Sequence, residues 1–291
     1  MSRDEFFLDP RAVRRSFDAA SVTYDAAAGV QSEIRARLLE RLDVVKLEPR
    51  TVLDLGAGTG HTSRALKQRY RAAQVVALDL STGMLRESAR QQGFLRKFER
   101  LAADSHRLPL RDASVDLVLS NLMLEWCHDP DAVFAEVRRV LRPRGLFMFS
   151  TLGPDTLKEV REAWRRVDLY THVHRFIDMH DLGDALVRSG LAEPVMDTER
   201  VTVTYPNIDT LTRELRASGS RNVAFGRARG LIGRSRAEAV RRYGESSMRN
   251  HLLSISVEVV YGQAWAGEPR ARQPRGEVRV PVETLRHRRR S

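Results

Sequence analysis

Residues 52–60, Val-Leu-Asp-Leu-Gly-Ala-Gly-Thr-Gly, constrain the fold more than any other stretch of the sequence. An apolar run leads directly into three glycines, and a polar stretch with helical spacing follows from His61. Gly56 and Gly58 can take backbone dihedrals that side chains disfavour, and they let a ligand approach the main chain closely. Taken alone, the pattern fits either a cofactor-binding turn or an ordinary turn between a strand and a helix.

Short apolar runs and helical stretches alternate on both sides of this turn. The pattern predicts strands at residues 51–55, 74–80, 99–103, 116–120 and 146–151, and helices at 61–69, 82–92 and 131–141. Asp131 is the predicted N-cap of the last of these helices. Apolar strands that alternate with helices indicate an α/β fold with a mostly parallel sheet covered on both faces.

The regions around this core are organised differently. Residues 11–45 carry apolar residues at helical spacing, and the second half mixes predicted helices with strands at 198–205 and 254–265. We therefore expect an N-terminal helical cover and a doubly wound domain that carries helical cap insertions, followed by a basic extension. The expected boundaries are 1–48 for the cover, 49–265 for the domain, about 153–190 and 206–250 for the insertions, and 266–291 for the extension.

Composition limits the partners and the compartment. The net charge of +11, of which +5 belongs to residues 266–291, favours an acidic partner. No zinc-finger, RNP-type or helix-turn-helix signature points to nucleic acid, and no apolar run approaches the ~18–20 residues that cross a bilayer. Cys127 is the single cysteine, which favours a reducing cytoplasm and fits packing better than nucleophilic catalysis.

Polar residues follow successive predicted strands. Asp79 ends the second strand, 19 residues after Gly60, where a carboxylate can accept the hydroxyls of a ribose or cap the next helix. Asp104 and Ser105 follow the third strand, and Asn121 follows the fourth. Because the carboxyl ends of parallel strands share one edge of a sheet, these residues are expected to gather beside the glycine turn.

These signals, in order over residues 50–152, resemble the class I S-adenosylmethionine-dependent methyltransferases. A dinucleotide fingerprint would need glycine at position 61, where this chain has histidine. The resemblance implies a Rossmann-like sheet of seven strands and S-adenosylmethionine as cofactor. The cofactor contacts it implies are Asp54, Gly56, Ala57, Gly58, Gly60, Asp79, Leu80, Met84, Asp104, Ser105 and Asn121.

The flanking segments are similar to the malonyl-acyl-carrier-protein O-methyltransferases of biotin synthesis. Segments that carry this likeness include SNLMLEWCHDP at 120–130, FSTLGPDTLKEVREAW at 149–164 and VEVVYGQAW at 257–265. Glu125, His128 and Asp129 depart from it, because neutral residues are expected there, and the stretch 243–252 is irregular. The resemblance implies methyl transfer to the free carboxylate of a malonyl group on the phosphopantetheine of an acidic acyl carrier protein.

Two other interpretations remain open. One is a methyltransferase for another small acceptor, such as a quinone or a dicarboxylic acid. The other is an assembly factor that keeps the fold, because a methyltransferase-like assembly protein of mitochondrial complex I shares several of these segments. Neither is excluded by the sequence.

A carboxylate acceptor also decides which side chains to look for. It is ionised at neutral pH, so it needs no general base and no catalytic acid–base residue is expected. It does need a cation, and the planar guanidinium of arginine binds both oxygens of a carboxylate. The candidates are Arg175, then Arg15 and Arg14, with Tyr24 beside the cofactor. No metal site is expected, because the spacing of His172, His174, His180 and Asp181 matches no known zinc framework.

Overall fold

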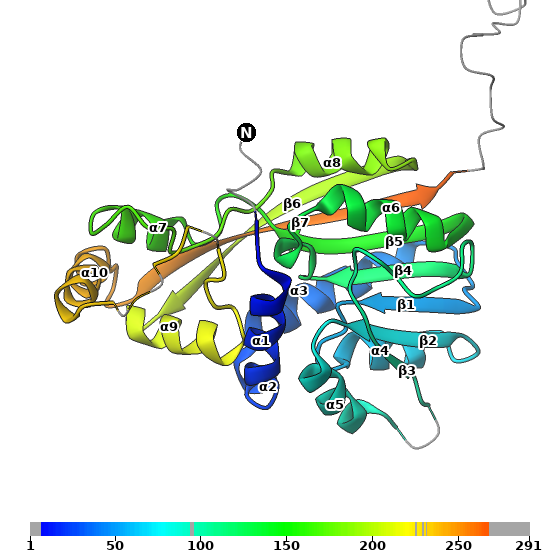
Figure 1. Ribbon diagram of the computed structural model, residues 1–291, viewed down its shortest axis with the longest axis horizontal. Helices are drawn as coiled ribbons and strands as arrows, with labels where there is room; N and C mark the ends of the chain where they lie inside the picture. Colours follow the sequence, from blue (N-terminus) through cyan, green and yellow to red (C-terminus); the bar gives the residue numbers. More distant parts are fainter. Residues whose placement is uncertain (1–6, 94–95, 225, 229, 231, 268–291) are drawn as a thin grey trace, which may run out of the picture.

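The computed structural model describes residues 7–93, 96–224, 226–228, 230 and 232–267. Its described part contains one seven-stranded sheet in the order β3-β2-β1-β4-β5-β7-β6 (Figure 1). The strands are β1 (Thr51–Leu55), β2 (Gln74–Asp79), β3 (Glu99–Ala102), β4 (Val115–Asn121), β5 (Leu141–Leu152), β6 (Leu191–Tyr205) and β7 (Leu253–Ala266).

The first five strands pair in parallel, and β7 runs antiparallel to both β5 and β6. Strand β1 lies inside the sheet, where Val52 pairs with Val75 of β2 on one side and with Leu117 of β4 on the other. The chain reverses its strand order at β1, so the turn after β1 opens at the switch point where α/β sheets bind ligands. The predicted mostly parallel, doubly wound sheet is confirmed.

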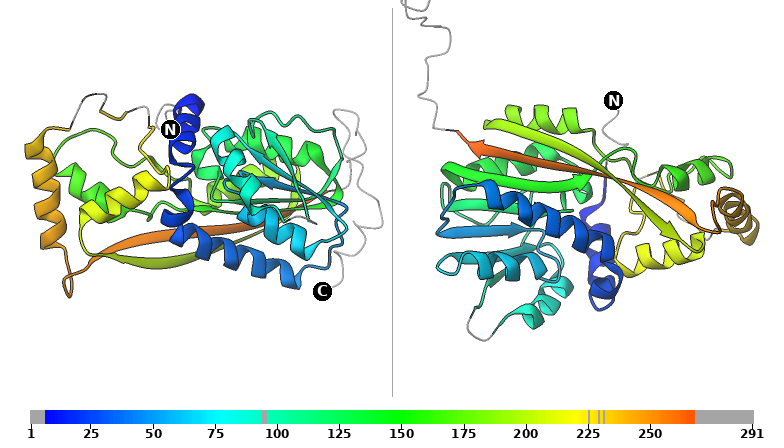
Figure 2. Two further views of the ribbon diagram at one scale, coloured as in Figure 1. Left: turned by 90° about the horizontal axis from the view of Figure 1, so that it is seen from below. Right: turned by 180° about the vertical axis from the view of Figure 1, so that it is seen from behind.

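Helices cover both faces of the sheet. On one face, α6 (Pro130–Val140) and α8 (Met179–Arg188) bury apolar side chains against Leu53 and Leu55. On the other face, α3 (Gly29–Glu40), α4 (His61–Arg69) and α5 (Thr82–Gln91) pack near Val52. The right view of Figure 2 shows α3 lying across the sheet. Burial on both faces explains why the central strands are continuous apolar runs.

A cap lies beyond one end of this core (Figure 1). Helices α7 (Lys158–Arg165), α9 (Ile208–Ala217) and α10 (Arg234–Ser246) share a separate apolar cluster with the neighbouring ends of β6 and β7. Helices α1 (Pro10–Ala20) and α2 (Tyr24–Ala27) lie between the cap and the sheet, and η2 (Arg41–Val44) follows α3. The N-terminal residues therefore connect the two parts of the molecule.

Several element boundaries differ from the sequence prediction. Strand β6 begins at Leu191, seven residues before the predicted start, because it follows β7 in a long antiparallel pairing that joins Leu191 to Ala266. Helix α6 begins at Pro130 and is capped by Asp129, whose side chain accepts from the Ala132 amide at 3.1 Å; the prediction of Asp131 as cap was wrong.

The described part of the chain ends before most of the basic extension. Of the predicted basic extension, residues 268–291 lie outside the described residues. Among the helices that the structure describes, none is both long and apolar enough to span a bilayer.

Candidate functional site

The turn after β1 is built from left-handed glycines. Gly56, Gly58 and Gly60 have φ angles of 80°, 53° and 86°. A Cβ on Gly56 would lie 2.4 Å from Cγ of Met123, so this position has no room for a side chain. The amides of Gly56 and Ala57 donate to the carbonyl of Leu78 at 2.8 and 2.9 Å, which ties the turn to β2. The glycines thus expose a backbone surface at the sheet edge.

Asp79 lies directly beside this turn. Its two carboxylate oxygens accept from the Gly58 amide at 2.8 Å and from the Ser81 amide at 2.7 Å. Burial raises the pKa of Asp79 to about 6, with the nearby charge of Asp18 adding to the rise and the two amides opposing it. Each oxygen keeps a free lone pair, so the carboxylate can accept two further hydrogen bonds, as a ribose diol requires.

Asp18, which the sequence interpretation missed, holds α1 on α5. Its Oδ1 accepts from the Ser81 hydroxyl at 2.6 Å and from the Gly83 amide at 2.8 Å, at the N-terminus of α5. Its Oδ2 lies 3.5 Å from the Nε of Arg14. These hydrogen bonds keep the pKa of Asp18 below its usual value, although burial acts the other way. Helix α1 is thereby fixed over the glycine turn.

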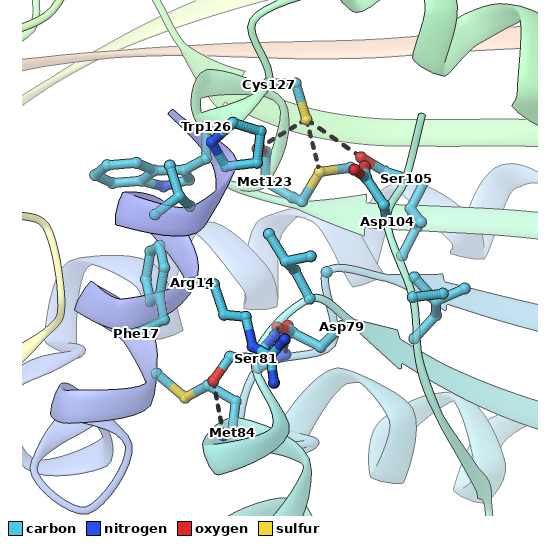
Figure 3. Close-up of a pocket in the computed structure, with 18 of the residues that line it drawn as sticks. Arg14, Phe17, Asp79, Ser81, Met84, Asp104, Ser105, Met123, Trp126 and Cys127 are labelled. Carbon is cyan, nitrogen blue, oxygen red and sulfur yellow. Dashed lines mark hydrogen bonds between the residues drawn. The ribbon is translucent and has the colours of Figure 1, made fainter. Parts of the chain in front are cut away.

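A pocket of about 790 Å³, partly open to solvent, lies between α1, the glycine turn and the strand ends (Figure 3). Most of the predicted cofactor residues line it, namely Gly56, Gly58, Asp79, Leu80, Met84, Asp104, Ser105 and Asn121. Asp54, Ala57 and Gly60 do not line it. The predicted residues therefore divide into a group that faces the pocket and a group behind it.

The residues behind the pocket support the turn. Asp54 is buried and accepts a short hydrogen bond from the Ser63 hydroxyl, while its Oδ1 is buried and has no hydrogen-bond partner among the described residues. Burial raises the pKa of Asp54 to about 7. Gly60 is the N-cap of α4, and a Cβ there would lie 2.7 Å from Cβ of Ser88. Ala57 is buried in the cluster beneath the sheet.

The other end of the pocket follows β3 and β4. Asp104 accepts from the backbone amide and from the Nδ1 of His106. Asn121 is fixed by its neighbours, since its Oδ1 accepts from the Ser150 hydroxyl at 2.9 Å and its Nδ2 lies 3.5 Å from the carbonyl oxygen of Gln31. The pocket thus has one acidic residue near each end, Asp79 and Asp104.

An apolar and aromatic wall closes the side that faces the cap. Phe17 and Trp126 line the pocket and meet edge to face with ring centroids 5.1 Å apart. His174 packs on the far side of Trp126 at 5.0 Å. Phe17 is one of the apolar residues at helical spacing in 11–45, and that pattern does not show which side chains face a pocket.

The residues predicted to bind the methyl acceptor lie in different places. Tyr24 and Arg14 line the pocket. Arg15, one position later on α1, is exposed and lies 4.0 Å from Asp9. Arg175 lines a smaller neighbouring pocket of about 320 Å³, together with Glu125 and Thr151, and Cys127 belongs to both pockets. The structure therefore brings Arg14 to the cofactor pocket and leaves Arg15 outside it.

The cap histidines do not meet at one centre. His172 pairs with Asp168 at 2.8 Å and stacks on Trp164. His174 is buried, and desolvation lowers its pKa to about 4. His180 is exposed and lies 2.8 Å from Asp178 at the start of α8. The three histidines therefore lie in separate surroundings, each with its own neighbours.

The residues present fit S-adenosylmethionine. The glycine turn leaves open space beside Gly58, where a Cβ would meet no atom within 4 Å, and Asp79 has free acceptor capacity. Asp104 provides an acceptor at the other end, and Leu80, Met84 and Phe17 supply apolar surface between them. Such a pocket can hold a ribose, an adenine ring and a methionine chain.

Comparisons with known proteins identify the fold and the family. A methyltransferase domain family matches residues 53–149. Two solved structures share the fold. A putative methyltransferase from Bacillus halodurans has a TM-score of 0.57 and 17% identity, with 80% of this chain and 99% of that chain covered. Phosphoethanolamine N-methyltransferase 2 from Haemonchus contortus, in complex with S-adenosyl-L-methionine, has a TM-score of 0.55 and 16% identity, with 86% of this chain and 57% of that chain covered.

Sequence relatives are much closer. A malonyl-acyl-carrier-protein O-methyltransferase from Methylovorus sp. is 50% identical over 282 residues, with 95% of each chain covered. One from Laribacter hongkongensis is 46% identical, with 96% of this chain and 97% of the relative covered. Since the glycine turn, the acidic strand ends and the cap all lie within these matches, the chain belongs to the malonyl-acyl-carrier-protein O-methyltransferase family.

Proposed function

We propose that this protein transfers a methyl group from S-adenosylmethionine to the free carboxylate of malonyl-acyl carrier protein, and so forms the malonyl methyl ester for biotin synthesis. The observation that carries the proposal is 50% identity to a relative of that name over 95% of both chains. The cytoplasmic location favoured by the single cysteine is part of the proposal.

The chemistry needs alignment more than acid–base catalysis. S-adenosylmethionine supplies an electrophilic methyl group on its sulfonium. The acceptor carboxylate is already ionised at neutral pH, so no side chain has to remove a proton from it. The protein must bind both molecules in line and keep water out. Helix α1, with Val13 and Phe17 on the pocket, excludes water from one side.

Tyr24 and Arg14 are the residues of the main pocket that we propose bind the methyl acceptor. Burial and the charges of Asp79 and Glu125 raise the pKa of Tyr24, so its phenol stays protonated and can donate a hydrogen bond to a carboxylate or a thioester carbonyl. Arg14 adds a guanidinium at the same pocket. Arg175 in the neighbouring pocket is the alternative cation for the malonyl group.

The acyl carrier protein is proposed to dock by charge. Helices α1 and α2 lie beside α9, where the Thr23 hydroxyl donates to the carbonyl of Ala217 at 2.8 Å. Exposed arginines on α1 and α9 face solvent around this junction, namely Arg11, Arg15, Arg213 and Arg216. An acidic carrier would be attracted to such a surface and steered toward the pocket.

Methyl transfer from radiolabelled S-adenosylmethionine tests the proposal. Malonyl-acyl carrier protein should become labelled in an alkali-labile ester, whereas acetyl-acyl carrier protein, which lacks the free carboxylate, should not. Asp79→Ala is the matched inactive control, because it removes the proposed ribose contacts. The proposal is wrong if pure, folded protein labels free malonate or a quinone but not the carrier-bound malonyl group. Restored growth of a biotin auxotroph would give independent support.

A further inference from the structure

Two histidines stack beside the pocket, although they come from distant parts of the chain. His106 follows β3 and His128 follows β4, and their rings lie 4.4 Å apart with an interplanar angle of 24°. Phe7 packs against His128 with ring centroids 5.5 Å apart. His128 is one of the residues at which the sequence departs from its family resemblance, and the structure places it against a second histidine.

His106 holds Asp104 by two bonds to one oxygen. The backbone amide of His106 donates to Oδ1 of Asp104 at 2.9 Å, and its Nδ1 lies 2.7 Å from the same atom. The side chain of His106 is 17% exposed, whereas that of Asp104 is 44% exposed. Oδ1 is therefore occupied, and Oδ2 is the oxygen that can accept from a ligand in the pocket that both residues line.

The stack holds the ring of His106 in place. Nδ1 of His106 lies against Asp104, and its Nε2 is buried without a hydrogen-bond partner among the described residues. Nδ1 of His128 is buried in the same way. With no polar partner for these two atoms, ring packing is what keeps the imidazole of His106 from rotating away from Asp104.

We propose that His106, braced by His128, is a positioning residue that aims Oδ2 of Asp104 at the exocyclic amino group of the adenine. Asp104 makes the contact, and His106 acts through it. Adenine donates from its amino group, whereas hypoxanthine has a carbonyl there, so a fixed carboxylate distinguishes the two bases. This inference depends on the cofactor and not on the acceptor, so it stands or falls separately from the proposed function.

The positioning role of His106 is tested by measuring the affinities of S-adenosylhomocysteine and S-inosylhomocysteine by calorimetry. His106→Ala should weaken S-adenosylhomocysteine about tenfold and S-inosylhomocysteine much less, so base discrimination drops. Asp104→Ala should have a similar effect, and the double variant should be little worse than Asp104→Ala, because both remove one contact. His106→Asn, whose side-chain amide can donate in place of Nδ1, should recover most of the discrimination.

The bracing role has its own control. His128→Phe keeps a ring in the stack and should bind like the wild type, whereas His128→Ala should lose part of the discrimination. Circular dichroism of each variant checks that it is folded. The inference is overturned if His106→Ala weakens both ligands equally, or if the effects of His106→Ala and Asp104→Ala add in full.

Discussion

Protonation of Asp79 should make cofactor affinity depend on pH in a range where few carboxylates titrate. Burial raises the pKa of this carboxyl to about 6 in the unliganded protein. Ribose hydroxyls donate to the ionised form, so binding requires the proton to leave. For a group with that pKa, the ionised fraction falls from nearly all at pH 7.5 to about a tenth at pH 5. The dissociation constant of S-adenosylhomocysteine should therefore rise about tenfold over that interval.

Variants assign the effect to this residue. Asp79→Asn cannot ionise, so its affinity should be weaker at pH 7.5 by about 1.5–3 kcal/mol for the altered charge-assisted bonds. It should also change little with pH below 7.5. Asp18→Asn removes a charge that contributes to the raised pKa of Asp79, and it should shift the inflection to lower pH without abolishing it.

Isothermal titration between pH 5 and 7.5, with the fold checked by circular dichroism, is the assay. A flat profile in the folded wild-type protein would refute the reasoning. It would mean either that Asp79 does not bind the ribose or that burial does not raise the pKa of its carboxyl. A full slope that persists in Asp79→Asn would assign the titration to another group.

Other consequences can be measured independently. Gly56→Ala should lower the melting temperature and cofactor affinity more than Gly58→Ala, because only the former brings a Cβ against Met123; equal losses would contradict this. Burial raises the pKa of Glu125 to about 8, above its ordinary value of 4.5, so the ionised form is disfavoured in the fold. Wild-type stability should then fall as pH rises from about 5 to 8, and Glu125→Gln, which keeps a carbonyl for Thr151, should make that fall smaller, with Asp54 and Asp79 contributing the rest. For the carrier substrate, KM should rise steeply between 50 and 500 mM salt while cofactor affinity changes little, as exposed pairs are screened beyond ~8–10 Å; a KM independent of salt would exclude docking by charge.

Local patterns explain most of what could be predicted. The strand at 51–55 and the helix at 61–69 match β1 and α4 residue for residue, because the glycine turn marks where the strand ends and the helix begins. Asp79 was predicted at the pocket because a carboxylate at the end of a parallel strand must lie at the shared sheet edge. The start of β6 was missed, since antiparallel pairing with a distant strand decides it.

What the sequence by itself determined is the doubly wound core and the residues at its strand ends, because periodicity and glycine turns are local. The tertiary structure decided which neighbours face the pocket. Arg14 lines it and Arg15 does not, since one step along a helix turns a side chain by about 100° and the packing of Val13 against Val223 sets the rotation. The hydrogen bond from Ser81 to Asp18 and the stack of His106 on His128 join segments that are far apart in the sequence. Such contacts produce no periodic pattern in the sequence, because they depend on how whole helices and strands pack in the folded protein.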